Sequence, residues 1–307
     1  DWAADNASLI VDRIDRDTKR RQIFFVHNAG GKAEKIILVT EEIDQKWIAP
    51  LSRIVEPHPK DKSQILFASE KDGFNHLYLA YLEKNSLDSN PGGANPERQP
   101  NPTDGGGFTG KVGIRQLTRG NFEIDWAKWS ADAAQIVFSS TEAGAAEREF
   151  YSLFTDNQEK TKIFSGAETG MKTGAQIDKT NAQPVLLYNF SRWNQPTDLY
   201  ATKVCPRGGG GGGGRFSAAR LTNSVPERFR QTNWSEPKFL NIPTRDGKQV
   251  PAKIYLPANF NQKQKYPMVV FVHGAGYLQN IINGWNNYYR EFMFHTILTQ
   301  KGYVVLD

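Results

Sequence analysis

The sequence has little cysteine, no long apolar run and no dense block of charge. Its one cysteine, Cys205, excludes an intrachain disulfide and a cysteine-based metal cluster. No apolar run approaches the roughly 18 to 20 residues that a membrane-crossing helix needs, so we predict no transmembrane segment. The net charge is +5, but the basic residues are interspersed with 33 acidic ones and the densest basic run is only Lys19-Arg20-Arg21. This dispersion argues against nucleic-acid binding.

The two ends of the chain also lack the usual terminal signals. Asp1 is not preceded by an initiator methionine or a leader-like segment, and Asp307 ends the sequence inside an apparent strand. We therefore expect an internal piece of a longer protein. A composition of 38% apolar and 12% aromatic residues in 307 residues is sufficient for the cores of two domains.

Residues 1 to 222 are dominated by short apolar strands that recur in a fixed order. Four copies follow each other at a spacing of roughly 50 residues, which indicates a repeat architecture. The first strands contain Leu9-Ile10-Val11, Ile65-Leu66-Phe67, Ile136-Val137-Phe138 and Val185-Leu186-Leu187. The second contain Ile23-Phe24, Leu77-Tyr78, Phe150-Tyr151 and Leu199-Tyr200, and the third Lys35-Ile36-Ile37, Gln116-Leu117-Thr118, Lys162-Ile163-Phe164 and Arg220-Leu221-Thr222.

Antiparallel units of this length are typical of the blades of a β-propeller, in which each blade buries a face against the next. The pattern Trp-x-x-Asp precedes the first strand in two copies, at Trp2 and Trp129. Four blades do not close a ring well, whereas seven or eight do, so we predict a partial propeller of about four blades. A β-sandwich is the alternative, disfavoured because sandwiches do not repeat their strand order.

Two stretches interrupt the repeat. Ser86 to Gly110 is rich in Pro, Gly and Asn and predicts a mobile surface excursion between the second and third strands of its blade. Gly208 to Gly214 is an unbroken glycine run and predicts disorder. A phosphate-binding glycine loop is the alternative for this run, but no Lys-Ser/Thr pair and no helix follow it.

The histidines do not form a recognisable metal motif. His58 and His76 lie at predicted strand edges or turns, and neither has a second histidine or a carboxylate at ligand spacing. We expect turn and packing roles for both. The sequence predicts no metal site and no cofactor.

The pattern changes after Thr222. Residues 225–236 form a polar connection, and two strands then flank Asp246-Gly247, a strong hairpin signal. An apolar run, Met268 to Val272, predicts a buried strand, and the spacing from Gly284 to Lys301 predicts a helix that stops at Gly302 before a strand over 303–306. A hairpin followed by strand, loop, helix and strand is how a doubly wound α/β domain begins.

The apolar run leads directly into His273-Gly274-Ala275-Gly276-Tyr277. Glycines let a backbone approach a reacting carbonyl closely, and N–H groups of such a loop can hold a developing oxyanion. An ordinary strand followed by a glycine turn is the alternative.

Several segments together resemble the prolyl oligopeptidase family of serine peptidases, in particular its dipeptidyl peptidase IV-like branch. They are P-A-K-I-Y-L-P, K-Y-P-M-V-V-F-V-H-G-A-G and G-Y-V-V-L-D in the C-terminal part, and E-P-H with D-G-F-N-H-L-Y in the repeat. The resemblance implies a partial propeller at 1–224, a connection at 225–236 and the start of an α/β-hydrolase domain at 237–307.

The resemblance also implies a Ser-Asp-His triad and a propeller that admits only short or terminal peptide segments. No Gly-x-Ser-x-Gly elbow occurs in these 307 residues, so the triad is expected beyond Asp307 and this chain alone should be inactive. Relatives have a tyrosine that donates to the oxyanion, and its position is taken by His273. His273, the backbone N–H groups near Gly274 and Ala275, and Tyr277 remain candidates for that role, with structural roles as the alternative. Glu41-Glu42 is not assigned to binding a substrate amino terminus, because the pair follows a third blade strand.

The sequence thus predicts a fragment of a serine peptidase that releases N-terminal dipeptides, with peptide substrates and no nucleic acid. The full-length protein could form homo-oligomers, and a periplasmic or secreted location is expected. The alternatives are a non-catalytic propeller protein that binds peptides or partners, and an esterase-type α/β-hydrolase. Sequence beyond Asp307 would distinguish them. Expressed alone, the piece is expected to be poorly soluble because it exposes strand edges.

Overall fold

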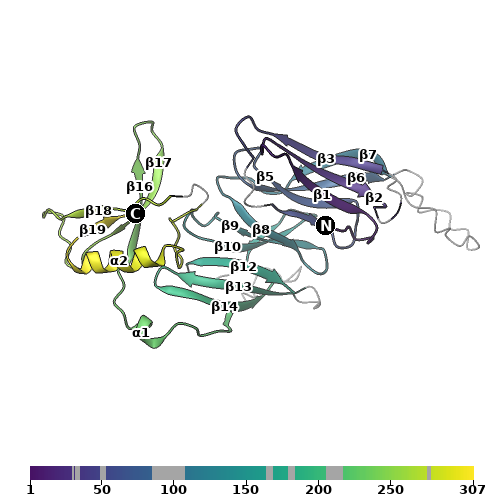
Figure 1. Ribbon diagram of the computed structural model, residues 1–307. Helices are drawn as coiled ribbons and strands as arrows, with labels where there is room; N and C mark the ends of the chain where they lie inside the picture. The colour runs from purple at the N-terminus through teal and green to yellow at the C-terminus, as the bar shows by residue number, and fades with distance from the viewer. Residues whose placement is uncertain are drawn as a thin grey trace, which may run out of the picture. The chain divides into compact units, whose positions relative to one another are not determined.

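The computed structural model describes residues 1–29, 31, 35–48, 53–84, 108–163, 169–178, 184–204, 217–274 and 278–307 (Figure 1). Over these residues the chain is mainly β and forms five sheets. It divides into two compact units, Asp1–Phe138 with Leu153–Glu159, and Ser139–Ser152 with Lys160–Asp307. Cys205, the glycine run and most of the predicted excursion after Ser86 lie outside the described residues.

The first sheet is an antiparallel meander of β1 (Leu9–Ile14), β2 (Arg20–His27) and β3 (Lys35–Ile43). The alternation of Ile, Phe and Val in β2 gives an alternating burial pattern, as expected for a strand with one face on a core. An isolated bridge from Trp2 to Leu9 adds a fourth chain segment beside β1.

The second sheet has the order β4 (Val55–Pro57), β5 (Gln64–Ser69), β6 (His76–Lys84) and β7 (Phe108–Gln116). All neighbours are antiparallel. Residues 108–110 belong to β7, so the predicted excursion was drawn too far at its C-terminal end. The ladder to β6 supplies hydrogen bonds that the glycine-rich composition did not suggest.

The first two sheets pack face to face. Ile23 and Phe25 of β2 share one cluster with Ile65 and Phe67 of β5, and all four side chains are fully buried. The Phe25 ring meets Phe108 edge to face, with ring centroids 5.1 Å apart. Sheet stacked on sheet, with the central strand β5 almost wholly buried, is the packing expected of neighbouring propeller blades.

The third and fourth sheets repeat the four-strand plan. The third contains β8 (Ile124–Trp129), β9 (Gln135–Ser140), β10 (Glu149–Phe154) and β11 (Lys160–Lys162), and its strands are shared between the two units. The fourth contains β12 (Met171–Ile177), β13 (Val185–Arg192), β14 (Gln195–Lys203) and β15 (Ala219–Arg220). Sequence analysis found three strands in each repeat and missed the first strand of each of these sheets.

A short helix interrupts the predicted connection. α1 (Glu227–Arg230) is a single turn, and the Trp234 indole N–H donates to the Phe229 carbonyl at 2.9 Å, which folds the segment back on itself. The next sheet begins with the hairpin of β16 (Pro237–Pro243) and β17 (Gln249–Tyr255). Gly247 has φ of 79° at its turn, which confirms the predicted Asp-Gly hairpin.

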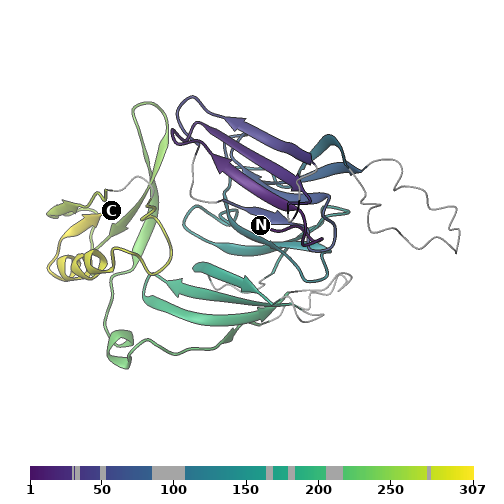
Figure 2. The same cartoon turned by 45° about the vertical axis from the view of Figure 1, so that its right-hand side comes forward.

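The last sheet has the order β16-β17-β19-β18 and is mixed. β18 (Met268–Val270) is parallel to β19 (Val304–Leu306), and α2 (Tyr289–Gln300) connects them. Figure 2 shows the β16–β17 hairpin extending beyond these two shorter strands. The helix starts at Tyr289 instead of Gly284, and just before it the Tyr288 N–H donates to the Asn286 side chain at 2.8 Å. Gly302 follows its last turn with φ of 87°.

The predicted burial of the Met268 to Val272 strand is wrong. Met268, Val270 and Val272 are 51%, 59% and 81% exposed, whereas Phe271 on the opposite face contacts Tyr288 and His295. The reason is that β18 is an edge strand, and α2 packs on only one face of this sheet in the described part of the chain. No described helix has the length and apolar character needed to cross a membrane.

Candidate functional site

The parallel strands β18 and β19 bring the predicted loop to one edge of the last sheet. The Phe271 N–H donates to the Leu306 carbonyl at 2.8 Å, so the pairing continues one residue beyond β18. His273 and Gly274 follow at the carboxyl end of this strand. In open sheets with parallel strands, that end is where ligands usually bind.

His273 makes one hydrogen bond and one ring contact. Its Nδ1 lies 2.6 Å from the Gly274 carbonyl oxygen, and its ring centroid lies 5.7 Å from that of Tyr288. A carbonyl oxygen only accepts, so Nδ1 carries the hydrogen. In the neutral ring Nε2 is then an acceptor, and it becomes a donor only in the imidazolium form. Of the other predicted candidates, Ala275 and Tyr277 lie outside the described residues.

The segment after the loop is attached to the 144–148 turn of the third sheet, within the same compact unit. Gln279 donates from Nε2 to the Ala145 carbonyl at 2.7 Å and accepts from the Arg148 guanidinium at 3.0 Å. Asn283 donates from its backbone N–H to the Ala146 carbonyl at 2.8 Å and from Nδ2 to Glu147 at 2.8 Å. Four hydrogen bonds therefore fix residues 279–283 against this turn.

The fourth sheet supports the same segment through a close backbone approach. A Cβ on Gly284 would lie 2.2 Å from Cγ of Met171, which explains why glycine is needed there. The adjacent Trp285 N–H donates to the Ser191 hydroxyl at 3.1 Å. The indole then packs edge to face on Phe292 of α2, with centroids 5.7 Å apart.

Buried charge lies behind the segment. Lys253 of β17 and Asp307 are 3.5 Å apart, with 4% and 5% of their side chains exposed. Burial lowers the pKa of Lys253, and the Asp307 carboxylate offsets this only in part. The pair lines a cavity of about 10 Å³ together with Asn286 and Tyr288. That is room for a single water molecule. Sequence reasoning missed these residues because they are scattered along the chain, and a lone lysine in the apolar β17 was the available signal.

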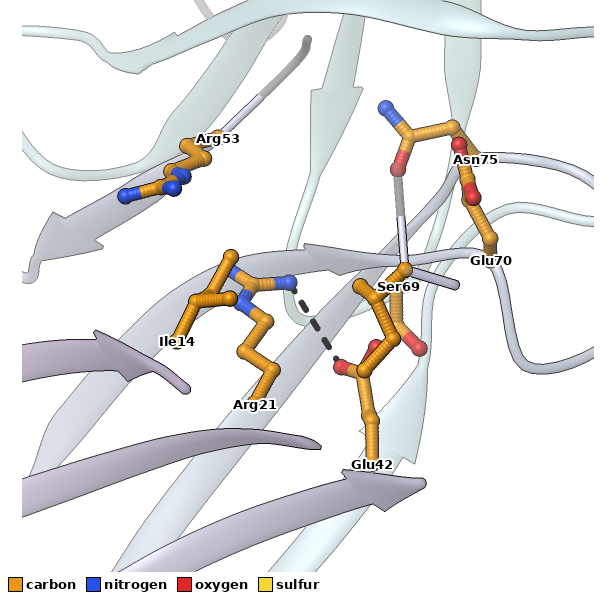
Figure 3. A pocket seen from close by; sticks show the side chains of 8 residues that line it. Ile14, Arg21, Glu42, Arg53, Ser69, Glu70 and Asn75 are labelled. Carbon is orange, nitrogen blue, oxygen red and sulfur yellow. Dashed lines mark ion pairs between the residues drawn. The ribbon is translucent and has the colours of Figure 1, made fainter. Parts of the chain in front are cut away.

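A second cluster of charge occupies a pocket in the first compact unit (Figure 3). Arg21 donates two hydrogen bonds to Asp12 at 3.0 and 3.2 Å and a third to the Ala68 carbonyl at 2.6 Å. Figure 3 shows its guanidinium facing the Glu42 carboxylate, at 3.5 Å. Burial raises the pKa of Glu42, and Arg21 offsets this only in part.

This pocket encloses only about 10 Å³, enough for a water molecule and too small for a peptide side chain. The structure also separates the two glutamates, since neighbouring strand residues point to opposite faces. Glu41 is exposed and accepts from Gln22 at 2.7 Å, whereas Glu42 lines the pocket. Both lie within β3 itself, not after it. The cluster joins the first two sheets through buried polar contacts.

The two histidines of the repeat have structural contacts. His58 Nδ1 accepts from the N–H groups of Lys60 and Asp61 at 3.1 and 2.9 Å, and burial lowers its pKa. His76 is buried between the Thr118 hydroxyl, 3.0 Å from Nδ1, and the Gly120 carbonyl, 2.9 Å from Nε2. Among the described residues no group of three His, Cys, Asp or Glu side chains is placed to hold a metal ion.

Comparison with known proteins relates this chain to dipeptidyl peptidases. Residues 1–194 match the family model described as the dipeptidyl peptidase IV (DPP IV) N-terminal region. Dipeptidyl peptidase 4 of Trichophyton rubrum is 24% identical over 173 residues, covering 56% of this chain and 21% of the relative. A probable dipeptidyl peptidase 4 of Trichophyton verrucosum is 25% identical over 174 residues, 56% of this chain and 22% of that protein. The chain thus spans about a fifth of these relatives' length.

Solved structures show the same fold at low identity. A putative dipeptidyl aminopeptidase IV from Bacteroides ovatus aligns with a TM-score of 0.68 and 20% identity, over 100% of this chain and 40% of that chain. Dipeptidyl peptidase 4 of Porphyromonas gingivalis aligns with a TM-score of 0.67 and 18% identity, over 98% of this chain and 36% of that chain. The four-strand sheets are therefore consistent with propeller blades, and the resemblance found in the sequence is confirmed.

Proposed function

Because the chain belongs to the dipeptidyl peptidase IV N-terminal region family, we propose that it is part of a serine peptidase that releases N-terminal dipeptides. The family match ends at residue 194, but the two bacterial structures align over 98% and 100% of the chain. Their likeness in fold therefore extends into the segment that carries His273.

We further propose the division made from the sequence: partial propeller at 1–224, connection at 225–236 and the start of an α/β-hydrolase domain at 237–307. The observation that supports the last part is the parallel pair β18 and β19 joined by α2. The exposed apolar face of β18 is what a sheet shows before further layers cover it. On this proposal the triad is supplied by residues outside this sequence, and the 307-residue chain alone is inactive.

The observation that carries the proposal is the position of His273 at the carboxyl end of β18, with its Nδ1 bonded to Gly274. Peptide hydrolysis by a serine nucleophile places negative charge on the substrate carbonyl oxygen, and donors aimed at that oxygen lower the barrier. Protonated His273 offers Nε2–H for this purpose, and backbone N–H groups beside it offer a second donor. A role for neutral His273 as donor is disfavoured, because its single hydrogen is held by the Gly274 carbonyl.

The test uses the full-length protein and a panel of dipeptidyl p-nitroanilides, with a p-nitrophenyl acyl ester as the competing substrate class. We expect dipeptide release, and a fall in kcat of roughly 10²- to 10³-fold for His273→Ala. His273→Tyr should restore activity, because a phenol donates without prior protonation.

Two results would contradict the proposal. A full-length protein that cleaves the ester but none of the peptides would be an esterase. A full-length protein that is folded, binds peptides and cleaves neither substrate would be a non-catalytic binding protein.

A further inference from the structure

Hydrogen bonds behind the loop run in one direction through two asparagine side chains. The Tyr288 N–H donates to Asn286 Oδ1 at 2.8 Å, and Asn286 Nδ2 donates to Asn280 Oδ1. Asn280 Nδ2 in turn donates to Asp307 Oδ1, whose other carboxylate oxygen faces Lys253. Each amide donates toward the carboxylate and accepts from the opposite side, so both amides have a single orientation. Hydrogen bonds connected in series and ending on a charged group are stronger than isolated hydrogen bonds between amides.

The charged end of this series of hydrogen bonds, the Lys253–Asp307 pair, is rigidly fixed. Lys253 and Asp307 exchange backbone hydrogen bonds of 2.7 and 2.8 Å, so their side chains leave neighbouring strands side by side. A buried ion pair is a poor source of stability, because desolvation opposes the Coulomb attraction, but it can define geometry. Its contribution here is a fixed carboxylate on which Asn280 is oriented.

The other end of the hydrogen-bond series, at Tyr288, reaches the proposed oxyanion loop. The Tyr288 ring lies between two side chains of the extended β18 segment. Its centroid is 5.6 Å from that of Phe271 and 5.7 Å from that of His273. Rotation of the Tyr288 backbone would therefore move the surface on which the His273 ring rests.

We propose that Asn280 and Asn286 are positioning residues. They hold the Tyr288 backbone in place relative to the buried Lys253–Asp307 pair, and the Tyr288 ring in turn orients His273. This inference rests on the proposed function of His273 in peptide hydrolysis.

The segment has other attachments, so the two amides are not needed merely to hold it in place. Gln279 and Asn283 bind the 144–148 turn, and Trp285 bonds to Ser191. Truncation of Asn280 or Asn286 leaves these contacts intact. It removes the path from the carboxylate to Tyr288, and Asn286→Ala also removes the bond from Asn286 Nδ2 to the Asn280 carbonyl at 3.2 Å. The expected consequence is a misplaced His273 and not an unfolded segment.

The experiment compares Asn280→Ala and Asn286→Ala with Asn287→Ala in the full-length protein. Asn287 is the exposed neighbour of Asn286 and serves as the matched control. For a cleaved dipeptidyl p-nitroanilide we expect kcat to fall roughly 10- to 100-fold in the first two variants, with KM within about twofold of wild type. The control should keep both parameters.

A second measurement does not depend on activity. Selectively ¹³C-labelled histidine gives an NMR signal for His273, assigned by its loss in His273→Ala. We expect the chemical shift of this signal to change in Asn280→Ala and Asn286→Ala, and to stay at the wild-type value in Asn287→Ala.

The two readouts separate this inference from the proposed function. If wild type cleaves no peptide, the peptidase proposal fails, and the histidine signal still decides whether the amides orient His273. If wild type is active while both variants keep kcat and the His273 signal, the inference is overturned. A fall in kcat that parallels loss of folded protein, with an unchanged His273 signal, would also overturn it.

Discussion

The buried ion pair between Lys172 and Glu149 gives the sharpest stability prediction. Lys172 Nζ lies 2.7 Å from Glu149 Oε1, with 4% and 5% of the side chains exposed, and Lys162 lies 3.6 Å from the second carboxylate oxygen. At an effective dielectric constant of about 20, the first attraction amounts to about 6 kcal/mol and the second to about 5 kcal/mol before screening. Desolvation of each buried ion opposes this by several kcal/mol.

Lys172→Met removes the stronger partner and leaves Glu149 buried beside a lysine that is 41% exposed. Losing one partner of a buried pair usually lowers the free energy of unfolding by about 3 to 5 kcal/mol. Because Lys162 still faces the carboxylate, we expect a loss near the lower limit, about 3 kcal/mol. Adding Glu149→Gln removes the unpaired charge and should recover stability to within about 1 kcal/mol of wild type.

Hydrogen exchange of peptides from β10 and β12 measures the change in local free energy of unfolding, so the whole chain does not have to unfold in one step. Lys172→Met and the double variant with Glu149→Gln are compared with wild type at the same pH and salt concentration. A loss below about 1 kcal/mol in Lys172→Met would refute the reasoning that the pair is desolvated. A double variant no more stable than the single one would show that the loss comes from packing and not from an unpaired charge.

Three further substitutions test other features by thermal denaturation and hydrogen exchange. Gly170→Ala should destabilise by about 1 to 3 kcal/mol, since a Cβ would lie 2.6 Å from the Ser191 carbonyl oxygen at φ of 152°. Phe25→Ala should lower the free energy of unfolding by about 3 to 5 kcal/mol, because the ring is fully buried between two sheets. Burial raises the pKa of Asp5, but hydrogen bonds from the following loop outweigh it and lower the value from 3.8 to about 2. This carboxylate stabilises the fold above pH 3.8 and loses its effect as pH falls to about 2, so Asp5→Asn should cost about 1 kcal/mol at neutral pH and nothing below the folded pKa.

The repeat was predictable because its strands carry a strong local signal. Apolar runs such as Ile65-Leu66-Phe67 become central strands, and their regular recurrence requires a repeated sheet. The first strand of the second sheet was not predictable, since Val55–Pro57 has three residues and ends in a proline. Its strand conformation comes from antiparallel pairing with β5, and so short a segment carries no periodicity of its own.

The candidate site was predictable only where it is contiguous in sequence. His273 and Gly274 follow an apolar strand, and their location at its end follows from that order. The supporting residues come from three separate parts of the chain, at Lys253, at Asn280 and at Asp307, and asparagines in a polar segment carry no periodicity. The exposure of Val270 was also beyond sequence reasoning, because an edge strand and a central strand can have the same composition.

The attachment of Asn283 to the 144–148 turn has a consequence for chemical ageing. Asn283 precedes Gly284, and glycine leaves the next backbone nitrogen unusually free to attack the side-chain amide and expel ammonia. Water then opens the resulting succinimide to aspartate or isoaspartate. The Asn283 amide donates to Glu147, so the resulting aspartate would place a second carboxylate against the first. Repulsion would then replace a hydrogen bond at the point where this segment meets the third sheet. Storage at alkaline pH, followed by peptide mass analysis and hydrogen exchange of residues 278–283, should show deamidation and loosening together.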